Sequence, residues 1–404
     1  MRKENDMAAY YRHSAAVIKT VRFAVLLAFV LFAVYCIGYF SSNLTEDSVR
    51  SVINTVYRSF DDLTPSETEI KIHTDDSSSF IIMHNDLAVV SNAGTELYSF
   101  SGDKLLEYDY TYSDAAAVKD GEYLLVYDIS GKEVSLYNGV AKLYSTAFEY
   151  DVKAADVNSM GYFAVVNSEM TYRSGIIVYG PKNGGKYGEI FRWMSPDKYV
   201  LALSLNSNAS ELVCAAVFNR SGAFVTELIV YDVNTGEKKH SVELDDTMIM
   251  KLGYTDNDGS IYALADGRFL SFDKNLQVKE ASEFSRTNAV FFKEAEDMFV
   301  VAESNNLSGS SMTINLFGYD AKLYAQLETD EKVLDADFAD SRLYVLYKEK
   351  LVIYDVENGE LSQYTQLPLD VQYKAVRADS YGRYVLIGAK NALRGSVESL
   401  VLAE

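Results

Sequence analysis

Two stretches of the sequence, LIVYDVNTGEKKHSVEL at residues 228–244 and LVIYDVENGELSQYTQL at residues 351–367, align without a gap. They share seven of seventeen positions, namely Leu, Tyr, Asp, Val, Gly, Glu and Leu. In each stretch, runs rich in β-branched and aromatic residues flank an Asn/Gly turn, where glycine adopts a positive φ without steric cost. The pair therefore indicates a repeated β-hairpin, and an internal repeat of this kind decides the fold class.

Weaker copies of the hairpin bring the total to seven, and an apolar strand precedes each one. An eighth apolar strand, at residues 383–390, is followed only by a lone strand at 395–404. The five weaker copies lie at residues 95–110, 133–148, 175–193, 267–284 and 312–328. The hairpin turn near Gly102 and the turn near Gly359 are 257 residues apart and are separated by six repeats, so each repeat is about 43 residues long. That period and the strand pattern are typical of four-stranded β-propeller blades.

The predicted fold is therefore an all-β propeller of eight four-stranded blades, or seven if one weak unit is not a true blade. The last unit lacks an outer strand, and residues 67–73 (ETEIKIH) are an obvious donor. We expect them to pair with residues 395–403, because a terminal blade would otherwise expose an unpaired edge. Small residues in the first strand of several units (Ala115, Ala116, Ala117, Ala154, Ala155 and Ala336) suit strands crowded round a central channel, although ordinary tight packing explains them equally well.

Residues 23–40 (FAVLLAFVLFAVYCIGYF) form a run of 18 residues without a charge. A helix of that length covers about 27 Å, which matches the hydrocarbon core of a bilayer. The run is longer than the apolar part of a cleaved signal peptide and ends without a small-residue cleavage site. Lys19 and Arg22 precede it, so the positive-inside rule predicts a cytoplasmic N-terminus and an extracytoplasmic body.

The predicted organisation has four parts: a cytoplasmic tail (1–22), a transmembrane helix (23–40), an amphipathic stalk helix with its linker (41–66) and an extracytoplasmic propeller (67–404). Val49, Val52, Ile53 and Val56 belong to one apolar stripe of the stalk at helical spacing. This stripe packs either on its own domain or on another chain, so the oligomeric state stays open. The predicted localisation is the cell membrane, with a single pass.

The formal charge of −21 is unevenly distributed, because residues 41–404 carry 32 basic and 56 acidic side chains, a net of −24. A body this acidic repels phosphate backbones, so nucleic acid is not an expected partner. The charge favours either simple solubility or the binding of cations and basic partners. Cys36 lies in the predicted span and Cys214 in a strand, which excludes a disulfide framework.

The phrase Tyr231–Glu237 (YDVNTGE), repeated at Tyr354–Glu360 (YDVENGE), resembles the Y-D-x-x-[TN]-G-[EK] turn of quinoprotein-like and WD40-like propellers. The order of tail, anchor, stalk and cysteine-poor propeller is similar to that of uncharacterised single-pass proteins of Gram-positive bacteria. The resemblance implies a fold and no established activity. Catalytic quinoproteins carry a tryptophan in most blades, whereas this chain has only Trp193, so no cofactor is expected.

No catalytic constellation or metal site is predicted. His13, His73, His84 and His240 are dispersed without metal-ligand spacing, and residues 254–265 resemble a calcium loop whose first and last positions lack ligands. We therefore expect a non-catalytic binding or scaffold module for a protein or cell-wall ligand. The alternative is an enzyme acting on a saccharide or other small substrate in the channel. An enzyme should cluster perturbed acids at the channel mouth, whereas a binding module should expose an apolar patch; the ligand-binding residues themselves are not assigned.

Overall fold

The computed structural model describes Arg22, residues 25–27 and residues 68–397, with short gaps at 73, 75–76, 84–85, 100–101, 140, 169, 183–185, 256–258 and 296–297. The chain divides into two units, Met1–Tyr57 and Arg58–Glu404. In the first unit, Arg22 and residues 25–27 have helical backbone. Within the described part of the chain, no helix has both the length and the apolar character that crossing a membrane requires. The predicted stalk (41–66), and the predicted span (23–40) except residues 25–27, lie outside the described residues and stay predictions.

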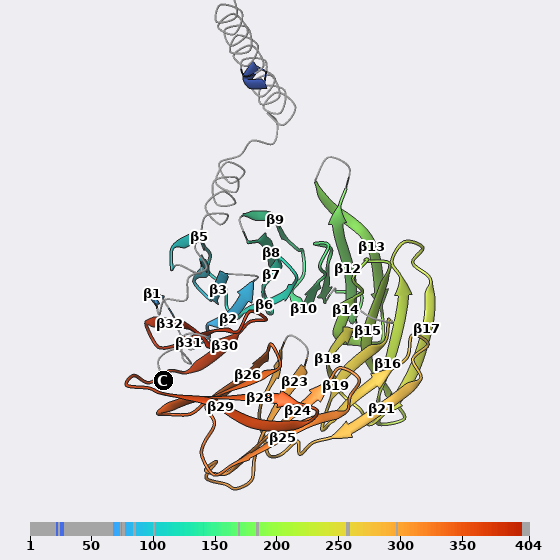
Figure 1. The fold of residues 1–404 in the computed structure, drawn as a ribbon. Helices are drawn as coiled ribbons and strands as arrows, with labels where there is room; N and C mark the ends of the chain where they lie inside the picture. The colour runs from blue at the N-terminus through green and yellow to red at the C-terminus, as the bar shows by residue number, and fades with distance from the viewer. Residues whose placement is uncertain are drawn as a thin grey trace, which may run out of the picture. The chain divides into compact units, whose positions relative to one another are not determined.

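The described residues of the second unit form 32 strands in eight four-stranded antiparallel sheets, the blades of a propeller (Figure 1). Blade 1 consists of β2 (Ser79–Met83), β3 (Asp86–Ser91), β4 (Gly94–Tyr98) and β5 (Lys104–Asp109), and blade 2 of β6 (Ala115–Asp120), β7 (Tyr123–Asp128), β8 (Glu133–Asn138) and β9 (Lys142–Ala147). Blade 3 consists of β10 (Val152–Val157), β11 (Phe163–Asn167), β12 (Ser174–Pro181) and β13 (Tyr187–Ser195), and blade 4 of β14 (Tyr199–Leu205), β15 (Glu211–Arg220), β16 (Ala223–Asp232) and β17 (Lys238–Asp245).

Blades 5 to 8 continue the same order, except that the last blade takes its outer strand from the start of the domain. Blade 5 consists of β18 (Ile249–Tyr254), β19 (Ile261–Ala265), β20 (Arg268–Phe272) and β21 (Val278–Glu283), and blade 6 of β22 (Ala289–Glu294), β23 (Met298–Ser304), β24 (Met312–Gly318) and β25 (Leu323–Thr329). Blade 7 consists of β26 (Asp335–Ala339), β27 (Arg342–Leu346), β28 (Lys350–Glu357) and β29 (Glu360–Pro368), and blade 8 of β30 (Ala375–Ala378), β31 (Arg383–Ile387), β32 (Asn391–Ser396) and β1 (Thr68–Lys71). The prediction of eight four-stranded blades is confirmed.

Sequence pattern explains the place of each strand within a blade. The second and third strands are apolar along most of their length and are buried on both faces, as in β11. The fourth strand alternates between exposed and half-buried residues, as in β17, because only one of its faces packs. The small residues Ala115, Ala155 and Ala336 lie in the first strands β6, β10 and β26, as expected, and first strands of neighbouring blades contact one another.

The hydrophobic core is divided into eight clusters, and each is shared by two neighbouring blades. One cluster, for example, joins Leu212 of blade 4 and Val178 of blade 3, and another joins Phe80 of blade 1 and Val385 of blade 8. All eight interfaces have such a cluster among the described residues. Each blade is therefore stabilised by both of its neighbours, because apolar side chains are buried at every interface between blades.

The ring is closed by β1, which pairs antiparallel with β32; these strands lie side by side in Figure 1 although they come from opposite ends of the domain. Closure by this segment was predicted, but the predicted partner, residues 395–403, was wrong. The partners run from Asn391, opposite Lys71, to Arg394, opposite Thr68. The tight turn after β31 accounts for the difference: Gly388 N–H donates to Asn391 C=O at 2.8 Å, so the next strand begins at once.

The antiparallel order gives the ring two distinct faces. Each first strand begins at one face, where the turns between second and third strands and the connections between blades also lie. We call this the connection face. Because β1 runs antiparallel to β32, Thr68 lies at the opposite face. The chain therefore enters the propeller on the side away from the connections between blades.

Ile70 provides a test of the closure, because its side chain is 2% exposed and packs against blades 1 and 8. We expect Ile70→Ala to lower the free energy of unfolding by about 2–4 kcal/mol. Urea denaturation followed by the fluorescence of Trp193, the only tryptophan, measures this. Lys71→Ala, an exposed neighbour on the same strand, is the control and should change stability little. Equal stability of the two variants would contradict closure by β1.

Candidate functional site

The first strands of four consecutive blades share an irregularity that the other four lack. In blades 3 to 6 the pairing of the first strand with the second shifts by one residue, which leaves one unpaired residue near the start of the strand. These residues are Lys153, Leu201, Met250 and Val290. The first strands of blades 1, 2, 7 and 8 pair without a shift. A β-bulge turns its extra side chain away from the packed sheet, and bulges are common beside functional sites.

On blades 4 to 6 the bulges help to present a band of exposed apolar side chains, which we call the apolar rim. All six members lie in or just before the first strands and are between 37% and 53% exposed: Tyr199, Leu201, Met248, Met250, Val290 and Phe292. The same connection face carries exposed Met170, Tyr172 and Leu307 in turns between second and third strands. Soluble proteins rarely leave so many large apolar side chains together unless the surface binds something.

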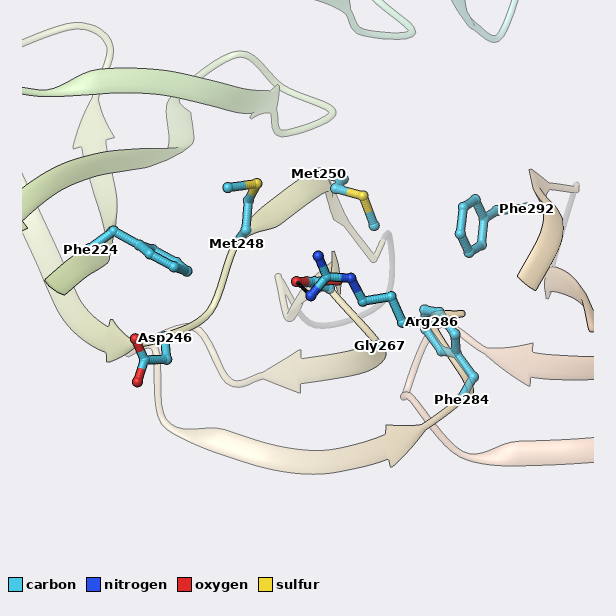
Figure 2. A pocket seen from close by; sticks show the side chains of 9 residues that line it. Phe224, Asp246, Met248, Met250, Gly267, Phe284, Arg286 and Phe292 are labelled. Carbon is cyan, nitrogen blue, oxygen red and sulfur yellow. Dashed lines mark ion pairs between the residues drawn. The ribbon is translucent and has the colours of Figure 1, made fainter. Parts of the chain in front are cut away.

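A groove of about 540 Å³ opens beside the rim at the junction of blades 4, 5 and 6. Phe224 and Phe292 lie on opposite sides of it, and Arg286 extends between them (Figure 2). Met248 and Met250 contribute two flexible thioether side chains to the same wall. Methionine adapts to differently shaped apolar partners, so this lining suits a binding surface.

The charged groups of the groove are unevenly paired. Arg286 Nη1 lies 2.6 Å from Asp266 Oδ2, so this guanidinium is neutralised within the groove. Asp246, in the connection between blades 4 and 5, is exposed, and no Lys or Arg among the described residues pairs with it. The groove therefore carries an excess negative charge beside its apolar wall.

A second polar cluster joins the first strands of blades 6, 7 and 8. Lys293 of blade 6 lies 3.1 Å from the Asp335 carboxylate of blade 7 and also donates to Val376 C=O of blade 8. Arg377 donates to the same carboxylate at 2.7 Å and to Phe80 C=O of blade 1 at 2.8 Å. We call these three charged residues the channel clamp. Because the two cations meet one carboxylate and three backbone carbonyls, those of Ala336, Val376 and Phe80, its chemistry is structural.

Burial shapes the titration of the clamp. It lowers the pKa of Lys293, because a buried ammonium loses its hydration. Burial alone would raise the pKa of Asp335, but Lys293 and Arg377 together hold that pKa below its ordinary value. The clamp therefore contains an ionised carboxylate at neutral pH.

A third cluster lies on the first strands of blades 3, 5 and 6. The Glu294 carboxylate accepts hydrogen bonds from Lys251 and from the Tyr262 hydroxyl. Tyr262 reaches it by crossing Gly253, its partner across the sheet, where a Cβ atom would lie only 2.0 Å from the Tyr262 ring. Glycine is therefore required at residue 253 by the close approach of the ring.

The two acids near this cluster have their pKa values shifted in opposite directions. Burial raises the pKa of Asp156 to about 7, although Leu205 N–H donates to its carboxylate at 2.8 Å. Burial also opposes the charge on Glu294, but Lys251 and the two hydrogen bonds lower its pKa overall. A pair of acids with separated pKa values is one requirement of acid–base catalysis. Both Glu294 oxygens already have partners, which leaves Glu294 little freedom to act on a substrate.

The residues singled out in the sequence do not converge on one site. Trp193 is half-buried, with its ring 5.5 Å from that of Tyr231, and Cys214 is buried and unpaired, as expected. His240 lies in outer strand β17, while the predicted span's Cys36 and the other three histidines lie outside the described residues. Residues 254–265 connect paired strands β18 and β19, and the described part of the chain has no group of three metal-binding side chains.

Sequence reasoning did not identify the apolar rim. A signal for it exists, since Tyr199/Leu201, Met248/Met250 and Val290/Phe292 are three apolar pairs with the same spacing of two. They recur just ahead of the main apolar strands of three successive repeats. Alternation normally buries one face of a strand, so such pairs look like core residues. The bulges at Leu201, Met250 and Val290, which the sequence pattern does not predict, place one residue of each pair at the surface.

A protein-family model described as "Family of unknown function (DUF5711)" matches residues 57–392. The chain belongs to this family. No curated protein matches the sequence at a significant level. The family extends over all eight blades and therefore includes both the apolar rim and the channel clamp.

Solved structures share the fold at low sequence identity. The C-terminal WD40 domain of Sif2 is 11% identical, with a TM-score of 0.55, and the match covers 82% of this chain and 97% of that domain. BamB from Moraxella catarrhalis is also 11% identical, with a TM-score of 0.51, covering 82% of this chain and 99% of BamB. The resemblance to WD40-like propellers is thus confirmed for the fold, while a membrane anchor and a Gram-positive origin stay predictions.

The raised pKa of Asp156 has a measurable consequence. The folded protein holds this proton up to a pH of about 7, whereas the unfolded chain loses it near pH 4, so Asp156 makes the fold less stable as pH rises between these values. Asp156→Asn keeps an acceptor for Leu205 N–H and cannot ionise. We expect the stability of the variant relative to the parent to increase by about 4 kcal/mol between pH 4 and pH 8. Urea denaturation at both pH values tests this, and a constant difference would contradict it.

Proposed function

We propose that the chain is a non-catalytic binding or scaffold module of the cell envelope, anchored through residues 23–40, which binds an envelope protein or a cell-wall polymer through the apolar rim. The observation that carries this proposal is the exposure of six large apolar side chains on three neighbouring blades. Propellers present binding sites on the loops and strand ends of one face. The rim and its groove occupy such a place.

Two further features support a built surface. Bulges in the first strand fall only in blades 3 to 6 among the described residues, and three of their four extra residues are apolar and exposed. Such residues gain nothing for the fold, since burying them would be more favourable by about 25 cal/mol per Å². Their exposure makes sense if a partner covers them.

The proposed topology rests on the sequence. Lys19 and Arg22 precede the uncharged run, which favours a cytoplasmic N-terminus and an extracytoplasmic propeller. The chain enters the ring at Thr68, on the face opposite to the apolar rim. The connection to the proposed anchor therefore begins on the other side of the ring from the proposed binding surface.

One observation favours a second candidate function, an enzyme acting on a saccharide or another small substrate in the channel. Asp156 and Glu294 have separated pKa values, as an acid and a base would. Against it, Lys251 and Tyr262 occupy both Glu294 oxygens. Hydrolysis of a saccharide that disappears in both Asp156→Asn and Glu294→Gln would favour the enzyme.

Placing a charge in the rim should abolish partner binding without unfolding the ring. We expect Met250→Glu to reduce photo-crosslinking of the full-length chain to its envelope partner in intact cells by at least tenfold, because a carboxylate would be buried on binding. The matched control is Met160→Glu. Met160 is 51% exposed, against 46% for Met250, and lies in a turn on the opposite face. Equal loss in both variants, or in neither, would refute the rim as the binding surface.

The topology is tested by proteolysis. Protease added to protoplasts should remove the propeller and leave the segment before residue 41 protected, because only that segment is proposed to lie in the membrane and the cytoplasm. Immunoblotting with tags at both ends of the chain follows each part. A propeller protected until the cells are lysed would contradict the proposed orientation.

A further inference from the structure

The groove beside the rim continues outward between blades 5 and 6. A second hollow of about 430 Å³ shares Phe284 with the first and extends past Glu303, Asn315 and Gln326. We call the two together the trough. Each volume falls within the range of sites that enclose a small ligand, and two neighbouring hollows that share a lining residue suit an extended one.

The two halves of the trough differ in chemistry. The inner half is apolar, with Met248, Met250 and Phe292 in its wall. In the outer half, Gln326 donates to Asn315 Oδ1 at 2.7 Å, and Ser285 N–H donates to the Glu303 carboxylate at 2.6 Å. A ligand that fits both halves must offer an apolar group at one end and polar groups at the other.

The charge of the trough is negative. Asp246, Asp266, Glu283 and Glu303 line it, against the single cation Arg286, which Asp266 already neutralises. None of the lysines and arginines that the structure describes forms an ion pair with Asp246, Glu283 or Glu303. Three carboxylates without a cation, next to apolar walls, are complementary to a basic ligand.

We propose that the trough binds an extended polypeptide segment that combines apolar side chains with lysine or arginine. This inference rests on the proposed function and names the class of partner. The apolar side chains would fill the groove beside Met250, and the basic ones would meet the exposed carboxylates of Asp246 and Glu283. The exposed side-chain amide of Gln326 offers a donor and an acceptor of the kind that a peptide backbone requires.

Other occupants fit less well. A second copy of this chain would bring the same three carboxylates toward an acidic surface, because the net charge is −21. An anionic lipid surface is repelled for the same reason. A neutral glycan gains nothing from the uncompensated acids. Charge complementarity therefore favours the polypeptide.

The test selects peptides from a library of random dodecapeptides displayed on phage, with the full-length chain as bait. We expect the enriched peptides to combine Leu, Phe or Trp with Lys or Arg. The double variant Asp246→Asn/Glu283→Gln should bind an enriched synthetic peptide at least tenfold more weakly, and Met250→Glu should bind it more weakly still. Fluorescence anisotropy at low and high salt measures these affinities, and salt should weaken binding to the parent.

The matched control is Glu357→Gln/Glu360→Gln, which removes two exposed acids at a turn of blade 7 on the opposite face. It should bind the peptide as tightly as the parent. Enrichment of acidic peptides, or affinities indifferent to the double variant, would overturn the inference. If no peptide is enriched while Met250→Glu still abolishes crosslinking to a glycan or to a second copy, the inference fails and the proposed binding function stands. If Met250→Glu affects no crosslink, both fail.

Discussion

The fold depends on closing a ring whose two ends come from distant parts of the sequence. Each blade buries its apolar faces only against its two neighbours, so an open ring would expose the faces of its terminal blades. At the outer edge of blade 8, four residues of β1 complete the sheet. Near the ring's centre, Lys293, Asp335 and Arg377 link blades 6, 7, 8 and 1 through one carboxylate and backbone carbonyls. Strand pairing and buried charge thus join the same side of the ring.

The two sides of the ring differ in how their first strands pair. First strands in blades 7, 8, 1 and 2 pair regularly, and the closing contacts lie in blades 7, 8 and 1 apart from Lys293 of blade 6. First strands in blades 3 to 6 carry the bulges and expose apolar side chains. The rim and the closing strand β1 therefore lie on different blades, while blade 6 contributes to both the rim and the channel clamp.

The sequence predicted the blades well because each of them repeats a strong local signal. Apolar second strands and hairpins with Asp and Gly turns recur every 43 residues or so, and the observed strands follow them closely. The closing segment was found by counting strands, yet its partner was misplaced by four residues. Asn391 begins the last strand immediately after a turn that carries no Asn-Gly signal.

The binding surface was harder to find because it depends on register. Met250 is apolar and flanked by apolar residues, so its sequence alone indicates burial. Its exposure follows from one unpaired residue in the ladder with β19. Likewise, the channel clamp joins Lys293, Asp335 and Arg377, which lie 42 residues apart, one blade repeat from each other. The residue type changes at each position, so the repeat does not reveal that these side chains meet. Features that arise from contact between blades cannot be obtained from the repeat of one blade.

The closing strand also determines when the growing chain can complete the ring during synthesis. Glu69 leaves the ribosome 322 residues before Asn391, its hydrogen-bonding partner in blade 8. At roughly 5–20 residues per second, this delay is on the order of 20–60 s. During that time β1 has no partner strand, and blades 1 to 7 accumulate as an incomplete ring whose two ends are prone to pair with other chains. Biogenesis of this protein therefore requires that the early segment stay unengaged until the last blade is made, a demand that falls on whatever escorts the nascent chain.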